Sequence, residues 1–233
     1  MDAIESLNQN VIACTNCARL VEYRQTVASV KRRMYREEEY WGRPLPGFGD
    51  PEARVLLVGL APAAHGGNRT GRMFTGDSSG DWLYGTLHKF GFASQPTSRH
   101  RDDGMTVQDV YITAAIRCAP PANKPLRDEL TACRPYLLQE LSLLKRLRVI
   151  VALGKIAFDA YLTAWESGDA HESPLSTPRP RFGHGATYSL PNAIILVASY
   201  HPSRQNTQTG RLTRPMFEDI FATVRRLLDG PAQ

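Results

Sequence analysis

The chain has few cysteines and no long hydrophobic run. Only 4 of its 233 residues are cysteine, and no apolar stretch approaches the roughly 20 residues that a membrane-spanning helix needs. The first residues, 1–5, lack a basic segment followed by an apolar one, so they do not resemble a secretion signal. We therefore expect a cytoplasmic protein, without membrane association, whose cysteines stay reduced.

Composition does not divide the chain into parts. Hydrophobic residues make up 42% of the sequence, which is enough for one sizeable core, and no internal repeat interrupts it. We expect a single domain over residues 1–233. The formal net charge of +5 favours an anionic partner only mildly, because small basic enzymes without nucleic-acid partners are common.

Four short apolar runs rich in β-branched residues predict strands that are buried on both faces. The runs are residues 55–60, 110–113, 149–153 and 194–198. Helical patterns lie between them: one follows a cap signal at Asp77, one surrounds Pro135, which should start or kink its helix, and one follows Thr213. Strands that alternate with helices predict a three-layer α/β/α sandwich with a central four-stranded parallel sheet.

In such a sheet, ligands bind beyond the carboxyl ends of the strands. Three of the four predicted strands are followed by loops with polar and small residues, at 61–77, 114–125 and 199–207, and we expect these loops to build one site. The stretch 166–185 holds three prolines among glycines and serines and predicts a long surface loop, whose function the sequence does not indicate.

The four cysteines form a close pair and two distant singles. Cys14 and Cys17 have the Cys-x-x-Cys spacing, and Cys118 and Cys133 lie near predicted strand or helix ends. A thioredoxin-like redox pair needs a preceding strand, for which the N-terminus leaves no room. Four thiolates suit zinc or an iron-sulfur cluster, and spacing alone does not choose between them.

Three residues of the predicted loops could carry chemistry. Phe74 and Asp77 lie within four residues of each other, although alone they would be interpreted as a core residue and a helix N-cap. His201 follows the last strand, where an imidazole can hydrogen-bond a leaving group. The small residues from Gly59 to Ala63 would let a flat ligand approach the main chain.

Taken together, these segments resemble the uracil-DNA glycosylase superfamily, specifically its iron-sulfur-containing family 5 (type B). The resemblance extends from Cys14 to about Leu228, and its most specific strings are residues 59–66, 70–77 and 201–212. It implies the uracil-DNA glycosylase fold. It also implies hydrolysis of the N-glycosidic bond of uracil in DNA after the nucleotide has been flipped out of the stack.

The resemblance assigns roles to residues in the predicted loops. It implies a structural [4Fe-4S] cluster held by Cys14, Cys17, Cys118 and Cys133. Phe74 is expected to stack on the base, and the first loop to hydrogen-bond its edge. The first-loop residues that we expect to bind the base are Gly59, Ala61, Ala63, Ala64 and His65.

Three residues are expected to be catalytic. His201 would donate to the base carbonyl as negative charge builds on the departing ring. Asp77 would stabilise the cationic sugar or orient the attacking water. Asn123 would read the base edge or position the water, although Asn68 competes for that role.

The first loop lacks a side chain that other branches of the superfamily carry. Those branches have an acidic residue or Asn where this chain has Ala61 and Ala63. This leaves the water without a first-loop base and makes the pocket roomier. We therefore expect activity on uracil and on other deaminated or altered bases.

DNA is the expected partner, double-stranded and also single-stranded, and we expect a monomer. The residues expected to contact DNA are Arg204, Gln205, Asn206, Arg211 and Lys124. Two other classes of function remain open. One is an iron-sulfur module that binds uracil-containing, abasic or single-stranded DNA without turnover, and the other is a small-molecule hydrolase that uses Asp77 and His201.

Overall fold

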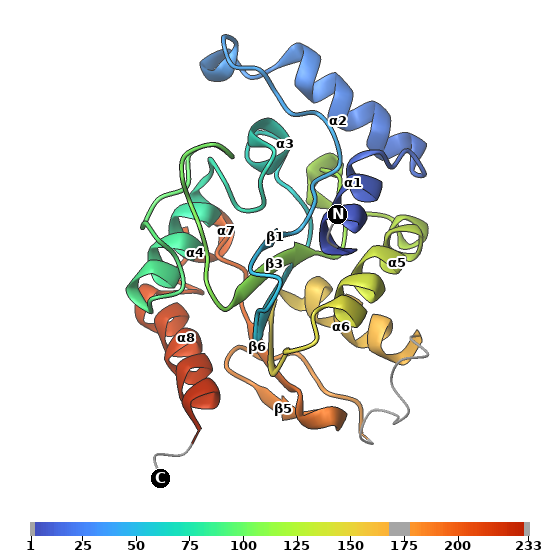
Figure 1. The fold of residues 1–233 in the computed structure, drawn as a ribbon. Coiled ribbons are helices and arrows are strands. Elements are labelled where there is room, and N and C mark those ends of the chain that lie inside the picture. The colour runs from blue at the N-terminus through green and yellow to red at the C-terminus, as the bar shows by residue number, and fades with distance from the viewer. Residues whose placement is uncertain (1–2, 168–177, 231–233) are drawn as a thin grey trace.

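A computed structural model describes residues 3–167 and 178–230 and contains one six-stranded sheet (Figure 1). The strand order is β1-β3-β2-β4-β6-β5. The four central strands run parallel: β2 (Val55–Gly59), β3 (Val110–Ala114), β4 (Val149–Leu153) and β6 (Ile195–Ser199). The two edge strands, β1 (Phe48–Gly49) and β5 (Thr187–Ser189), pair antiparallel to their neighbours.

The parallel centre of the sheet confirms the four predicted strands, but the predicted strand number is too low. The missed edge strands are two and three residues long and lie at least partly exposed. Segments this short leave no periodic pattern in the sequence, and their pairing depends on the neighbouring strand.

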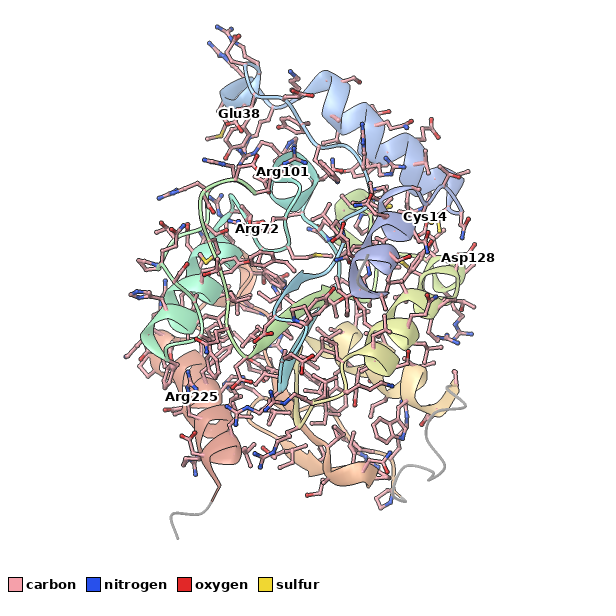
Figure 2. All side chains as sticks on the ribbon, viewed as in Figure 1. Cys14, Glu38, Arg72, Arg101, Asp128 and Arg225 are labelled. Carbon is pink, nitrogen blue, oxygen red and sulfur yellow. The ribbon has the colours of Figure 1, made fainter. Side chains whose placement is uncertain are left out.

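Helices cover both faces of the sheet, which confirms the three-layer sandwich (Figure 1). On one face lie α4 (Ser78–Lys89) and α8 (Arg214–Asp229). On the other lie α5 (Arg127–Leu143) and α6 (Lys155–Ser167), with α1 (Ala3–Ile12) packed on α5. The side chains drawn in Figure 2 fill the space between these layers.

Successive residues of the central strands point into two different cores. Val55 and Leu57 of β2 belong to the core under α4 and α8, whereas Leu56 and Val58 belong to the core under α5 and α6. All four are fully buried. Because both faces are covered, these strands are apolar at most positions and do not alternate with polar residues, which is why they appear in the sequence as nearly continuous runs.

The helix ends agree with the predicted caps at two places and differ at a third. The Asp77 carboxylate accepts a hydrogen bond from the Gly80 amide at 3.0 Å, and Thr213 Oγ1 accepts from the Met216 amide at 3.4 Å. Pro135 lies well inside α5 and does not start it. The helix begins instead at Arg127, because the Glu129 carboxylate accepts from the Leu126 amide at 2.7 Å.

The predicted surface loop over residues 166–185 is partly helical. Helix α6 extends through Ser167, and residues 168–177 lie outside the described part of the chain. Near the end of α6, Glu166 pairs with Arg179, so the residues that follow the gap pack back against this helix. No described helix is both long enough and apolar enough to cross a bilayer.

Shorter helices and turns connect the layers. Beside the cysteine pair lies α2 (Ala18–Val30), and loops of the sheet contain α3 (Gly67–Thr70) and α7 (Arg204–Gln208). The 3₁₀ turns are η1 (Arg33–Tyr35), η2 (Pro121–Asn123) and η3 (Pro191–Ala193).

Candidate active site

A pocket of about 550 Å³ lies where the parallel strands end at their carboxyl side, as expected for an open α/β sheet. This volume lies in the range of small-molecule sites, about 300–1,000 Å³. All four central strands contribute a following segment to it. The predicted site residues that line it are Ala61, Ala63, Phe74, Asp77, Asn123, His201, Gln205 and Arg211.

Phe74 is held in a strained backbone conformation at this pocket. Its φ angle is +52°, a conformation that costs a non-glycine residue about 1–3 kcal/mol. The Tyr84 hydroxyl donates to the Met73 carbonyl at 3.0 Å, and a Cβ on Gly80 would lie 1.9 Å from the Phe74 oxygen. The chain therefore keeps Phe74 in place by close backbone contacts, and its half-buried ring packs against the core under α4 and α8 and also lines the pocket.

The Phe74 ring stacks against His201 with 5.7 Å between centroids and 27° between planes. Behind it, a Cβ on Gly59 would lie 2.9 Å from the ring. The predicted role of Gly59 in binding the base is therefore indirect, because this residue makes room for Phe74 and does not line the pocket.

Asp77 is both a helix cap and a pocket residue. Its carboxylate accepts from the Gly80 amide and also lines the pocket. Burial raises its pKa above the ordinary value, and hydrogen bonds from the backbone of Gly80 and Ser79 partly oppose that effect. Asp77 is therefore the helix N-cap that the sequence indicated, and it also faces the pocket.

His201 is neutral at physiological pH. Burial lowers the pKa of its imidazole to about 4. Its backbone carbonyl accepts a hydrogen bond from the Asn206 amide side chain at 2.8 Å, which fixes the loop that carries the imidazole. A neutral imidazole has one N–H, so His201 can donate one hydrogen bond to a ligand without carrying charge.

The two asparagines that competed for one role lie in different environments. Asn68 is fully buried, and its side-chain amide donates to the Arg24 carbonyl at 3.2 Å. Asn123 is exposed, has a left-handed backbone with φ +55°, and lines the pocket. The structure therefore brings Asn123, and not Asn68, to the site.

Two other first-loop residues lie outside the lining. His65 shares a hydrogen bond of 3.1 Å with the Tyr40 hydroxyl, and burial, with Arg32 and Arg69, lowers its pKa. The carbonyl of Ala64 accepts from the Asn68 amide at 3.4 Å. Ala61 and Ala63 of the same loop do face the pocket, whereas Ala64 and His65 support the loop from behind.

Sequence reasoning missed the contribution of the strand β4. Lys155, Ile156 and Ala157, at the start of α6, also line the pocket. The available signal was Gly154, which follows an apolar run directly and adopts φ +98° where strand turns into helix.

Of the residues predicted to contact DNA, Gln205 and Arg211 line the pocket, whereas Arg204, Asn206 and Lys124 do not. Arg204, Gln205 and Arg211 are exposed, and the Arg211 guanidinium lies 4.6 Å from the Tyr200 ring centroid. Lys124 is exposed beside Asn123. Asn206 differs, because its amide nitrogen is already engaged with the His201 carbonyl.

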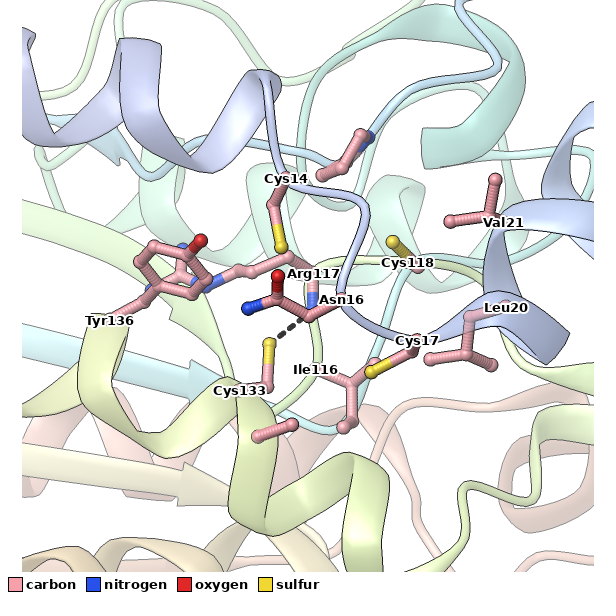
Figure 3. Close-up of a pocket in the computed structure, with 12 residues that line it drawn as sticks. Cys14, Asn16, Cys17, Leu20, Val21, Ile116, Arg117, Cys118, Cys133 and Tyr136 are labelled. Carbon is pink, nitrogen blue, oxygen red and sulfur yellow. Dashed lines mark hydrogen bonds between the residues drawn. The ribbon is translucent and has the colours of Figure 1, made fainter.

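The four cysteines line one small second pocket between α2, the end of β3 and α5 (Figure 3). The Cys133 sulfur accepts a hydrogen bond from the Arg117 backbone amide at 3.4 Å, drawn as a dashed line. Among the described residues, no three His, Cys, Asp or Glu side chains come together as ligands of a metal ion. Tetrahedral zinc, with Zn–S bonds of about 2.3 Å, needs sulfurs about 3.8 Å apart.

The surroundings of this pocket do not favour a redox-active pair. Burial raises the pKa of Cys118 to about 12 and that of Cys133 to about 11, and it also raises the pKa of Cys17. Thiols with raised pKa values are poor nucleophiles. A helix, α1, precedes Cys14 where a thioredoxin-like fold would have a strand.

The fold and the pocket define an α/β protein that can hold a flat ring between an aromatic face, a carboxylate and a neutral imidazole. Residues 46–225 match the family described as the uracil DNA glycosylase superfamily. A type-5 uracil-DNA glycosylase from Thermus thermophilus is 53% identical over 96% of this chain and 97% of its own length. The type-5 relative from Pyrobaculum aerophilum is 46% identical, over 93% of this chain and 88% of its own.

A more distant relative is the type-4 uracil-DNA glycosylase of Sulfurisphaera tokodaii, which is 26% identical over 99% of this chain and 87% of its own length. The chain therefore belongs to the uracil-DNA glycosylase superfamily and, within it, to the type-5 group.

Proposed function

We propose that this protein is a DNA-repair glycosylase that hydrolyses the N-glycosidic bond of uracil in DNA and leaves an abasic site. The observation that carries the proposal is the convergence of Phe74, Asp77, Asn123 and His201 on one pocket, in a chain that matches type-5 uracil-DNA glycosylases over nearly its whole length. A duplex hides the scissile bond, so the nucleotide must be flipped out at a cost of a few kcal/mol.

In the pocket, the flipped base stacks on the part of the Phe74 ring face that His201 does not cover. The backbone around Ala61 and Ala63 is close enough to the cavity to hydrogen-bond the edge of the base. Asn123 offers an amide with both a donor and an acceptor from the opposite loop. These contacts select a planar ring with polar edges and do not read the DNA sequence.

Departure of the base requires stabilisation of negative charge on its ring. His201, neutral because burial lowers its pKa to about 4, donates its N–H to the base carbonyl and transfers no proton. Asp77 lines the same pocket, and we assign it to the sugar side, where a carboxylate would stabilise the cationic deoxyribose or orient water. Because Ala61 and Ala63 provide no base in the first loop, expulsion of the leaving group carries more of the catalysis.

The same two alanines leave space that a larger side chain would fill. We therefore extend the proposal to other deaminated or altered bases of similar shape. The expected substrate is double-stranded DNA, and single-stranded DNA also enters the open pocket. The expected oligomeric state is a monomer, which sedimentation of the protein alone would test.

We also propose that Cys14, Cys17, Cys118 and Cys133 hold a [4Fe-4S] cluster. Each cysteine binds a separate iron in such a cluster, so the four sulfurs stand further apart than around one zinc ion. This spacing suits four cysteines that line one pocket without forming the ligand set of a single ion. The cluster supplies no step of the hydrolysis and ties the N-terminal segment to the end of β3 and to α5.

The cofactor proposal is tested by the metal content and the visible spectrum of protein purified without oxygen. We expect about four iron atoms per chain and absorption near roughly 400 nm. Stoichiometric zinc with no visible absorption would reject the cluster.

The activity is tested by incubating the protein with labelled duplex that contains one uracil and scoring alkali-sensitive breaks. We expect breaks at the uracil and none in the matched thymine duplex. Tight binding without breaks would identify a non-catalytic reader of uracil-containing DNA. If the protein neither bound nor cut the uracil duplex, the result would support the small-molecule hydrolase.

A further inference from the structure

Arg69 is a buried arginine of α3 whose guanidinium connects three segments of the chain. Only 7% of the residue is exposed. Its Nε donates to the His65 carbonyl at 2.8 Å, and its Nη2 donates to the Gly76 carbonyl at 2.8 Å. Its Nη1 pairs with the Glu38 carboxylate. All three nitrogens are therefore engaged.

The two carbonyls that Arg69 holds belong to the residues directly before Gly66 and Asp77. Gly76 precedes Asp77 directly, and the first loop approaches the carboxylate so closely that a Cβ on Gly66 would lie 2.0 Å from Asp77 Oδ2. A Cβ on Gly76 would lie 2.4 Å from Arg69 Nη2. The Gly66 backbone thus packs against the Asp77 side chain, and the Arg69 guanidinium bonds the carbonyl of the residue that precedes each of them.

A third segment fixes the guanidinium itself. The Tyr35 ring covers it at 3.9 Å, and Glu38, labelled in Figure 2, pairs with it from the stretch after η1. Further along the same stretch, the Trp41 amide donates to the Arg69 carbonyl at 2.9 Å. Arg69 does not line the base pocket, so it acts on the site through the loops that it holds and through its charge, which opposes the rise in the Asp77 pKa that burial causes.

We propose that Arg69 is a positioning residue for base excision. By holding the two carbonyls, it keeps the Asp77 carboxylate at a fixed position relative to the first loop. The inference rests on the proposed glycosylase activity and adds a residue that does not touch the substrate. A planar guanidinium is suited to the task because its N–H groups point in several fixed directions and reach two carbonyls at once. Lysine has a single ammonium on a flexible chain, so its N–H groups leave one atom and do not match the separate, fixed positions of Nε and Nη2.

The partner carboxylate contributes less to this arrangement than the two carbonyls do. The Glu38 side chain is 46% exposed, and an ion pair with an exposed partner stabilises a protein weakly. The effect of changing Arg69 should therefore come from the lost carbonyl bonds. A shift of about 1 Å in a catalytic group can lower a rate by about 100-fold.

The test is Arg69→Lys, measured by the single-turnover excision rate on uracil duplex and by the dissociation constant for product DNA with an abasic site. We expect the rate to fall by about 10- to 100-fold, while the dissociation constant changes less than about threefold. The rate should change more than the dissociation constant because the residues that contact DNA stay in place while the alignment of Asp77 is lost.

Arg54→Lys is the matched control. Arg54 is partly buried and bonds both oxygens of Asp109 beside the start of β2, at the far end of the sheet from the pocket. We expect it to lower the melting temperature while the excision rate stays within about twofold of wild type. A wild-type rate in Arg69→Lys, or an equal loss of rate in Arg54→Lys, would overturn the inference.

A second variant keeps the test informative if Arg69→Lys does not fold. Gly76→Ala places a methyl group against Arg69 Nη2 and should give the same loss of rate with DNA binding retained; an unchanged rate would contradict the proposal. Absence of excision by the wild-type chain would instead reject the glycosylase activity. The failure of the proposed function and the failure of this inference are therefore distinct results.

Discussion

Neutral His201 should make the stability of this protein fall in mild acid. Its pKa is about 4 in the folded chain, against an ordinary value of 6.5. Between these values the unfolded state binds a proton that the folded state does not, so stability decreases as pH falls from about 6.5 to about 4. The full shift corresponds to about 3 kcal/mol, and the part between pH 7 and pH 5 to about 2 kcal/mol.

The perturbation that isolates this effect is His201→Asn, which removes the titrating group. Urea unfolding followed by circular dichroism gives the free energy of unfolding of both proteins at pH 7 and pH 5. From pH 7 to pH 5, the free energy of unfolding of wild type should fall by about 2 kcal/mol more than that of the variant. Other titrating groups, such as His65 and Asp77, are present in both proteins, so their contributions cancel when the pH dependence of the variant is subtracted from that of wild type. An equal pH dependence in the two proteins would refute a buried, neutral His201.

Three further changes test the site. Asp77→Asn should slow excision by about 100-fold or more while binding to abasic DNA persists, because it removes charge stabilisation at the sugar; a wild-type rate would exclude Asp77 from the mechanism. Gly66→Ala should also slow excision, since its methyl group would lie 2.0 Å from Asp77 Oδ2, and thermal melting would show whether the fold is retained. A full rate in that variant would show that the carboxylate can move without loss. Cys14→Ser should remove absorption near roughly 400 nm and lower the melting temperature, because cluster binding is coupled to folding; unchanged absorption would exclude Cys14 as a ligand.

The layers of the fold were predictable because both faces of the sheet are covered. Burial on two sides makes each central strand largely apolar, as in Val55–Gly59, so its position was visible to within one residue without any contact information. The edge strands β1 and β5 were missed, because their pairing depends on β3 and β6 and leaves no pattern within two or three residues.

The pocket was predictable as a set of loops but not residue by residue. Asp77, Phe74 and His201 lie directly in segments that follow strands, so the topology alone brings them together. Asn68 and Asn123 have the same chemistry and both follow strands, and only packing shows that Asn68 is buried against the Arg24 carbonyl. Likewise, nothing in the sequence of α3 indicates that the Arg69 side chain turns toward the His65 and Gly76 carbonyls.

The sequence by itself determined the parallel centre of the sheet, the loops that carry the site and the family to which the chain belongs. These follow from local hydrophobicity and from short strings of residues, which are properties of neighbouring positions. Tertiary structure alone decided that Asp77, while it caps α4, also faces the pocket, and that His201 is neutral. It also decided that Arg69 holds the two loops together. Those properties depend on burial and on contacts between distant segments, and burial is what changes the charge of a side chain.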